Sequence, residues 1–166
     1  MVTSRMPVSA EMFSIPVNHD FLYVSRLASS MGIWPWVDVF MSTQLQNLLL
    51  SDLSAGPVAT GDAIGDESAS NLLLALRGDG VIVKPDLPIV PTDASFIAES
   101  AKSGVPLIAS TTSNNGVKTT YAVAIQRSGS SNTTFSLSKS DLGITTSAYF
   151  YNYFTQTATL VQPGGL

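Results

Sequence analysis

The pattern of apolar and polar positions predicts helices in the first part of the chain. Residues 21–31 form a strongly apolar run before Gly32, as is typical of a helix that ends at a C′ glycine. A second helix is expected after Ser42 or Thr43, either of which suits an N-cap. Its apolar face consists of positions three and four apart, Leu45, Leu48 and Leu49. Residues 1–20 contain two prolines and predict irregular structure with at most a short extended piece.

A glycine-punctuated acidic loop follows this helix, over residues 53–68. Gly56-Pro57 would end the helix, and Val58-Ala59 has the character of a short buried strand. Loops at the carboxyl ends of strands are where α/β proteins usually carry their chemistry. This loop carries three carboxylates, Asp62, Asp66 and Glu67. The alternative is a solvated turn in which Asp66 or Ser68 caps the next helix.

From residue 78 onward the pattern predicts strands. Val81–Val83 has the character of a buried strand, the proline-containing residues 85–91 of an extended connector, and Asp93 of an N-cap before a short helix. Further strands are expected at residues 107–109, 119–125, 135–137 and 148–154. Asn115-Gly116 is a candidate type I′ hairpin turn. Tyrosines 149, 151 and 153 share one strand face, for which sheet packing and carbohydrate binding are the alternatives.

Composition narrows the class of protein. The 166 residues suit one domain of ordinary size, and 45% hydrophobic against 12% charged residues predict apolar surface that a partner or a second copy would cover. The net charge of −4, without a Lys/Arg cluster, argues against nucleic-acid binding. The absence of cysteine excludes thiolate nucleophiles and Cys-ligated zinc.

Targeting signals are not evident in the sequence. The first residues lack the apolar segment of a signal peptide, and no apolar run is long enough to span a membrane. The expectation is a soluble protein without a membrane partner, whose compartment stays open.

The residues with chemical potential are few. His19 is the single histidine, so a histidine-dependent mechanism must use it; a structural or merely exposed role is the alternative. Trp34 and Trp36 could stack on a sugar or an acyl chain, or belong to the core. Asp38 lies between two valines, where a buried carboxylate would be costly unless it is paired.

The acidic loop also suggests a cation site. Asp62, Asp66 and Glu67 fall within six residues of a glycine-containing turn, and such oxygen ligands suit Ca²⁺, although the spacing is not that of an EF-hand. Two carboxylates for acid/base chemistry could come from Asp38, Asp62 and Asp66.

Three segments carry a resemblance to a known family. Residues 38–46 (DVFMSTQLQ), 53–65 (LSAGPVATGDAIG) and 77–93 (RGDGVIVKPDLPIVPTD) resemble the C-terminal part of large bacterial glycoside hydrolases related to α-galactosidases. The resemblance covers roughly residues 30–160 and implies the last β/α units of a (β/α)8 barrel followed by an antiparallel β-sandwich. A whole barrel needs about 250 residues, so only its end is represented. The expected fold is therefore α+β, with a partial barrel in residues 1–103 and a sandwich in residues 104–166.

The resemblance implies a hydrolase acting on a small-molecule substrate. In size and in its glycosidase-like relationship, the chain is also similar to small metagenome-derived hydrolases of N-acyl-homoserine lactones, which act in quorum quenching. There, a calcium-bound water held by Asp62 and Asp66 would attack the ring carbonyl, with Asp38 or His19 as the base. The alternative is a non-catalytic sandwich module of a glycosidase.

Overall fold

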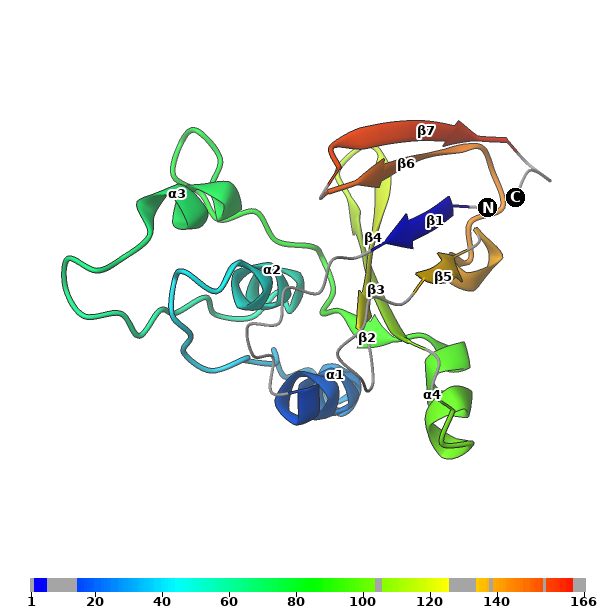
Figure 1. Cartoon of the computed structure of the whole chain (residues 1–166), viewed down its shortest axis with the longest axis horizontal. Coiled ribbons are helices and arrows are strands. Elements are labelled where there is room, and N and C mark those ends of the chain that lie inside the picture. The colour runs from blue at the N-terminus through cyan, green and yellow to red at the C-terminus, as the bar shows by residue number, and fades with distance from the viewer. Residues whose placement is uncertain are drawn as a thin grey trace.

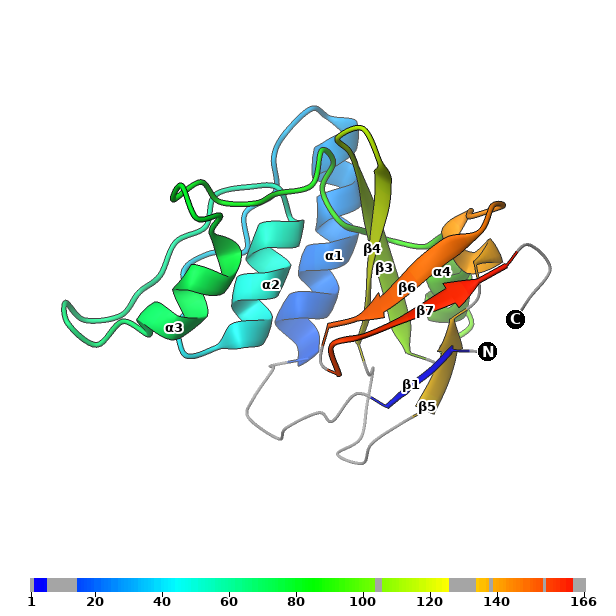
Figure 2. The same ribbon diagram turned by 90° about the horizontal axis from the view of Figure 1, so that it is seen from above.

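The computed structural model describes residues 2–5, 15–103, 106–125, 134–137, 139–153 and 155–162. It contains helices and antiparallel strands, which confirms the expected α+β class. Helices α1, α2 and α3 lie side by side on one side of the molecule, and the strands lie on the other (Figures 1 and 2). The helical elements are α1 (Ile15–Ser30), α2 (Leu45–Leu53), α3 (Ala69–Leu72), η1 (Leu73–Ala75), α4 (Asp93–Ser100) and η2 (Ser140–Leu142).

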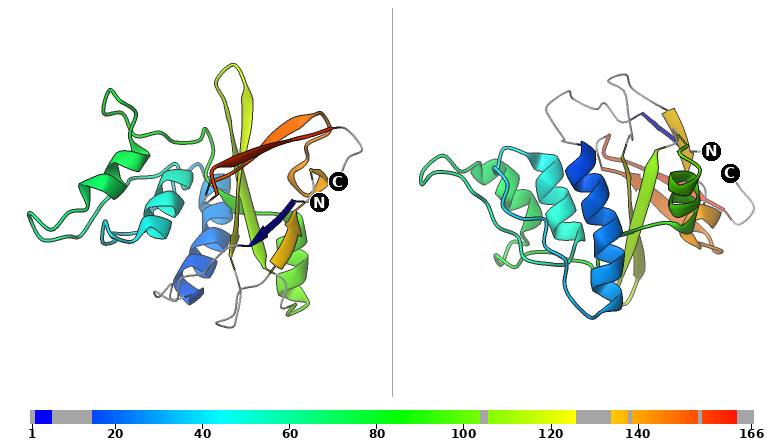
Figure 3. Two further views of the ribbon diagram at one scale, coloured as in Figure 1. Left: turned by 45° about the horizontal axis from the view of Figure 1, so that its top comes forward. Right: turned by 90° about the horizontal axis from the view of Figure 1, so that it is seen from below.

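The described strands form three small antiparallel sheets. One has the order β2-β3-β4, and the others are the pairs β1-β5 and β6-β7. Helix α4 lies across the three-stranded sheet from α2 and α3 (Figure 3). The strands are β1 (Val2–Arg5), β2 (Val90–Pro91), β3 (Leu107–Asn114), β4 (Lys118–Ile125), β5 (Thr134–Leu137), β6 (Ala148–Asn152) and β7 (Thr157–Val161).

Helix α1 confirms the predicted helix and extends it. Gly32 has φ 72°, and the N–H of Ile33 donates to the carbonyl of Ala28 at 2.9 Å, so the helix ends where the glycine predicts. The expectation of irregular structure up to residue 20 is wrong for residues 15–20, which are helical. Pro16 is compatible with this start because a proline in the first turn removes no intrahelical hydrogen bond.

Two predicted N-caps are wrong. Gln44, not Ser42 or Thr43, occupies the N-cap position of α2, and it makes no side-chain cap hydrogen bond. At α4 the cap is Thr92, whose Oγ1 accepts from the N–H of Ser95 at 3.3 Å, and Asp93 is the first helical residue. Ser42 is unavailable as a cap because its hydroxyl is bonded elsewhere in the fold.

The predicted buried strand at Val81–Val83 is also wrong. Val81 and Val83 are exposed, and pairing is limited to one antiparallel bridge between Leu76 and Ile82. A tight turn at Gly80, with φ 82°, reverses the chain here without a further strand to pair with. An apolar run alone therefore did not distinguish a strand from a loop.

The β3-β4 hairpin follows the predicted strands but not the predicted turn. Asn114 pairs with Lys118, so three residues form the loop. Of these, Gly116 has a positive φ of 78°, whereas Asn115 does not. A type I′ turn requires positive φ at both central positions, so this assignment is wrong. The last predicted strand is observed as β6, while Phe154 lies outside the described residues.

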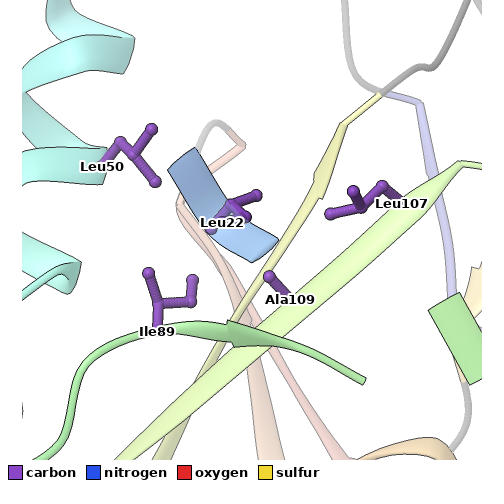
Figure 4. Packing of buried hydrophobic residues seen from close by; sticks show 5 residues of the cluster. All are labelled: Leu22, Leu50, Ile89, Leu107 and Ala109. Carbon is purple, nitrogen blue, oxygen red and sulfur yellow. The ribbon is translucent and has the colours of Figure 1, made fainter. Parts of the chain in front are cut away.

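The core joins the helices to the three-stranded sheet. Leu22 of α1 packs between Leu50 of α2 and strand β3, with Ile89 from the segment before β2 (Figure 4). The cluster consists of Leu22, Leu50, Ile89, Leu107 and Ala109. A smaller cluster under α2 contains Phe40, Leu48 and Ala75. In the parts of the chain that the structure describes, no helix has both the length and the hydropathy to cross a bilayer.

Two features bear on the expected domains and barrel. Phe40 and Thr60 form an isolated parallel bridge, and α2 lies between these two residues in the sequence. The expected strand at Val58-Ala59 is reduced to this contact. The predicted boundary after residue 103 is crossed by two pairings, β2 with β3 and β1 with β5.

Candidate functional site

Asp62 is bonded to Ser42 at the carboxyl ends of the two bridged segments. Its carboxylate accepts the Ser42 N–H at 2.9 Å and the Ser42 hydroxyl at 3.0 Å. The same hydroxyl oxygen accepts the N–H of Ser68 at 2.7 Å, and Asn71 donates to the carbonyl of Ser42 at 3.0 Å. Ser42 is fully buried. This network fixes both loops to one another and explains why Ser42 caps no helix.

The other two carboxylates of the acidic loop do not join Asp62. Asp66 and Glu67 are exposed, and Glu67 accepts the N–H of Gly65 at 2.8 Å, within its own turn. Among the described residues, no three acidic or histidine side chains are grouped so that they could hold a metal ion. Calcium binding by Asp62, Asp66 and Glu67 therefore stays a prediction. Ser68 does stand at the N-cap position of α3, without a side-chain cap bond.

Trp34, Trp36 and Asp38 are presented to solvent from one segment. The tryptophans are 56% and 51% exposed, and Asp38 is exposed as well. Pro35 is buried and Val37 is half-buried, which is the alternation of an extended chain with one outward side. The core alternative for the tryptophans is wrong, and so is the expectation of apolar surroundings for Asp38.

The backbone of Asp38 is unusual. Its φ is 77°, a left-handed conformation that is uncommon outside glycine although Asp tolerates it better than most residues. Its Oδ1 accepts the N–H of Val39 at 2.8 Å, which orients the carboxylate. Such an uncommon conformation is often found at functional sites.

Gly56 packs against the backbone of Pro35, the residue between the two tryptophans. A Cβ at this position would lie 1.9 Å from the carbonyl oxygen of Pro35, far inside van der Waals contact. The N–H of Gly56 donates to Ser54 Oγ at 3.1 Å, and Ser54 Oγ donates to the Ser51 carbonyl at 2.6 Å. The glycine of the SAGPV segment is therefore required because the Pro35 backbone passes directly over it.

Lys84, in the VKPD segment, contacts Gly56 of the SAGPV segment. Its Nζ donates to the carbonyl of Gly56, with Lys84 half-buried. The VKPD and SAGPV segments, 28 residues apart at these two positions, thus meet next to the Pro35 backbone.

Asp52 is a buried carboxylate that the sequence analysis did not select as a candidate site residue. It is 9% exposed, near the end of α2, and its Oδ1 has no hydrogen-bond partner among the described residues. Burial raises the pKa of Asp52 to about 7, and the positive charge of Lys84 opposes this rise. The signal that could have found it is a carboxylate between the apolar residues Leu50 and Leu53 of one helix.

Two further site predictions are placed without being joined to this group. His19 belongs to α1, but its side chain lies outside what the structure describes. Asp38 precedes Phe40 by two residues, whereas Asp62 follows Thr60 by two, so the parallel bridge places them toward opposite ends. Glycosidase carboxylates face each other across one bond, about 5–10 Å apart. The bridge does not arrange Asp38 and Asp62 in this way.

The β6-β7 ribbon exposes its tyrosines. Tyr149 and Tyr151 are 76% and 61% exposed on the same face, opposite Leu160 and Ala158 of β7. The packing alternative is therefore wrong for these two residues. Carbohydrate binding by this face stays a prediction.

Comparison with known proteins adds no relative. The chain matches no protein-family model, and neither a curated protein nor a solved structure is significantly similar to it. The resemblance to glycoside hydrolases therefore rests on the three quoted segments alone.

Proposed function

We propose that the chain is a hydrolase of the glycosidase class, whose substrate-contacting segment is Trp34–Asp38. The observation that carries this proposal is the exposure of both tryptophans beside an exposed carboxylate on one supported segment. Aromatic faces bind the apolar faces of sugar rings, and a carboxylate accepts hydrogen bonds from sugar hydroxyls. Together these groups favour a carbohydrate as the substrate.

Asp38 is the proposed general base. Its carboxylate is oriented by Val39 and faces solvent, so it can take a proton from a water molecule beside a bound substrate. The water oxygen would bond to the anomeric carbon as the glycosidic C–O bond breaks, and the departing oxygen would receive the proton. Asp62 is less suited to this role because the Ser42 N–H and hydroxyl already occupy its carboxylate. A positioning role for Asp62 in the loops at the carboxyl ends of the bridged segments fits its contacts better.

A second proposal is hydrolysis of an N-acyl-homoserine lactone. Ester hydrolysis needs one base, whereas glycoside hydrolysis normally uses two facing carboxylates, and Asp38 and Asp62 lie toward opposite ends of the bridged pair. Asp38 would take a proton from water, the water oxygen would bond to the ring carbonyl carbon, and the ring C–O bond would break. The departing oxygen would then receive the proton. The exposed apolar side chains of Val39 and Met41 offer contacts for an acyl chain.

The barrel origin is part of the same proposal. The parallel contact between Phe40 and Thr60, with α2 between them, supports a remnant of β/α units. The three small antiparallel sheets would then correspond to the sandwich. A non-catalytic, sugar-binding module is the alternative, and the exposed face of Tyr149 and Tyr151 favours it.

Calcium binding is proposed separately for the acidic loop. Three carboxylates within six residues support it, although Asp66 and Glu67 would have to turn toward Asp62. Calorimetry at millimolar Ca²⁺ should show heat that Asp62→Asn removes. Absence of heat in the wild type would exclude the site.

Self-association is proposed through α1. Val24, Leu27 and Met31 are 59%, 62% and 65% exposed at spacings of three and four, which makes an apolar stripe along the helix and its end. A second copy covering this stripe would give a dimer in light scattering, which Leu27→Glu should convert to a monomer. A monomeric wild type at high concentration would contradict this.

The test of the function is hydrolysis of two substrate panels, nitrophenyl glycosides and acyl-homoserine lactones, with and without Ca²⁺. Turnover on either panel that falls at least 100-fold in Asp38→Asn and persists in Asp79→Asn would support Asp38 as the base. Asp79 is a matched control because it is an exposed carboxylate whose partner in an ion pair is Arg77. No turnover on either panel would leave the non-catalytic alternative as the better account.

A further inference from the structure

Residues 77–80, Arg-Gly-Asp-Gly, form the tip of a short loop between η1 and β2. The N–H of Arg77 donates to the carbonyl of Val81 at 2.9 Å, and the N–H of Gly80 donates to the carbonyl of Arg77 at 2.9 Å. Gly80 has φ 82°, so the three tip residues end on a left-handed glycine, as in a common class of hairpin loop. An antiparallel bridge one position further along each arm closes the loop. The backbone therefore holds the tip in a defined conformation.

The two charged side chains of this tip are exposed and contact each other. Arg77 and Asp79 are 62% and 50% exposed, and Arg77 Nη2 lies 2.6 Å from Asp79 Oδ2. An ion pair exposed to this extent contributes little to stability, because water screens it. A Cβ at Gly78, between the two charges, would meet no atom within 4 Å, so the tip is open there. Both groups can therefore exchange each other for the charges of a partner at small cost.

An uncovered apolar segment adjoins the charged tip. Val81, Ile82 and Val83 are 52%, 37% and 49% exposed, although three β-branched residues in a row are typical of a buried strand. Exposed apolar side chains next to charged ones are characteristic of protein-binding surfaces, in which the apolar part is buried and the charges lie at the rim. A protein partner would cover this segment and contact the tip at the same time.

We propose that residues 77–83 dock onto a receptor protein that holds a divalent cation beside a carboxylate. The Asp79 carboxylate enters the coordination shell of the cation, since Mg²⁺ in proteins is usually bound through one or two carboxylates and several waters that a further oxygen ligand can replace. The Arg77 guanidinium donates two hydrogen bonds to the receptor carboxylate. Val81 and Val83 bury their exposed side chains against the receptor surface.

The charges of the loop select this kind of partner. One positive and one negative group, separated by a single glycine, complement a site that presents a carboxylate and a cation side by side. Arg77 is the only basic residue between Arg26 and Lys84 in the sequence, so the loop offers no basic patch for a phosphate-rich partner. Within the described part of the chain, no three acidic or histidine side chains are grouped to hold a metal. The cation therefore has to come with the partner.

An integrin ectodomain that binds Arg-Gly-Asp peptides is the probe, because it carries both the cation and the carboxylate. The full chain is immobilised, and saturable binding of the ectodomain is expected in Mg²⁺ and should be lost in EDTA. A soluble Arg-Gly-Asp peptide should compete, and an Arg-Gly-Glu peptide should not. Asp79→Glu keeps the charge but displaces the carboxylate by one methylene, and it should weaken binding by about 100-fold. Arg77→Ala should weaken it by about 10-fold.

Asp66→Glu is the matched control, because it makes the same substitution at another exposed carboxylate and should bind like the wild type. Circular dichroism confirms that each variant is folded. Absence of binding, binding that survives EDTA or Asp79→Glu, or an equal loss in Asp66→Glu would overturn the inference. The inference does not rest on the proposed hydrolase function. Receptor binding without turnover on either substrate panel would overturn that function alone, and turnover without receptor binding would overturn the docking loop alone.

Discussion

Asp62 and Asp52 lie near the two ends of α2 in opposite environments. The Asp62 carboxylate accepts hydrogen bonds from both the N–H and the hydroxyl of Ser42, which precedes the start of α2 at Leu45. Asp52 belongs to the last turn, is buried, and has an oxygen without a partner among the described residues. The Asp62 carboxylate has hydrogen-bond donors beside it. Burial raises the pKa of Asp52, which favours its protonated form.

The difference determines how each carboxylate affects the stability of the fold. A carboxylate that receives several hydrogen bonds stabilises the loops it joins. A buried carboxylate without enough donors costs stability, and such groups concentrate at functional sites. Asp62 of the acidic loop therefore has hydrogen-bond donors for its carboxylate, whereas Asp52 of the apolar helix is buried and has a raised pKa.

Gly56→Ala, near the Asp52 end of α2, should have the largest effect on the free energy of unfolding. The new Cβ would lie 1.9 Å from the Pro35 carbonyl oxygen, so the tryptophan segment has to move away. We expect a loss of about 3 kcal/mol in the free energy of unfolding, measured by urea denaturation. Gly78→Ala is the control because no atom lies within 4 Å of its added Cβ. Equal stability of the two variants would contradict a tight contact between Gly56 and the Pro35 carbonyl.

Asp62→Ala should show that the other carboxylate is structural. It leaves the buried N–H and hydroxyl of Ser42 without their acceptor, which should cost about 2 kcal/mol. Asp66→Ala is the matched control in the same loop, and its exposed side chain should contribute less than about 0.5 kcal/mol. Chemical denaturation of both variants measures the difference. If Asp66→Ala were as destabilising as Asp62→Ala, the Ser42 network would not be what holds the loop.

Asp52→Asn should change the pH dependence of stability. The pKa of Asp52 in the folded protein is about 7, against 3.8 for the ordinary group, so the folded state retains a proton that the unfolded state has lost. The stability of the wild type should therefore fall as pH rises from about 4 to 7 and level off above 7. Relative to the wild type, Asp52→Asn should gain on the order of 1 kcal/mol between pH 5 and pH 8, after allowance for solvent screening.

Melting temperatures across this pH range measure the effect of Asp52→Asn. Asp79→Asn, at an exposed carboxylate, is the control and should parallel the wild type. A stability difference between Asp52→Asn and the wild type that does not vary with pH would show that Asp52 is ionised throughout.

Local signals in the sequence predicted the elements better than their contacts. The apolar run before Gly32 and the spacing of Leu45 and Leu48 are patterns among residues close in the sequence, so α1 and α2 could be predicted from them. The role of Ser42 could not, because Asp62 and Ser68 reach it from 20 and 26 residues away. A long-range hydrogen bond overrode its local preference for an N-cap.

In the candidate site too, the residue types could be predicted from the sequence, whereas their tertiary contacts could not. Trp34, Trp36 and Asp38 were selected by residue type, and their common exposure depends on the buried Pro35 between them. The meeting of Gly56 with Lys84 is a tertiary contact that no periodicity reports. Val81–Val83 had the apolar character of a strand, but burial depends on what the rest of the chain places against it.

The central claim is that the Trp34–Asp38 segment contacts a saccharide. Its most direct test is titration of the purified protein with melibiose while tryptophan emission is recorded, alongside Asp38→Asn and Tyr149→Ala. The account predicts a saturable change in the wild type and in Tyr149→Ala, weakened at least 10-fold in Asp38→Asn by loss of a charged hydrogen-bond acceptor. An emission unchanged by the sugar, or a response that Tyr149→Ala removes and Asp38→Asn retains, would contradict it.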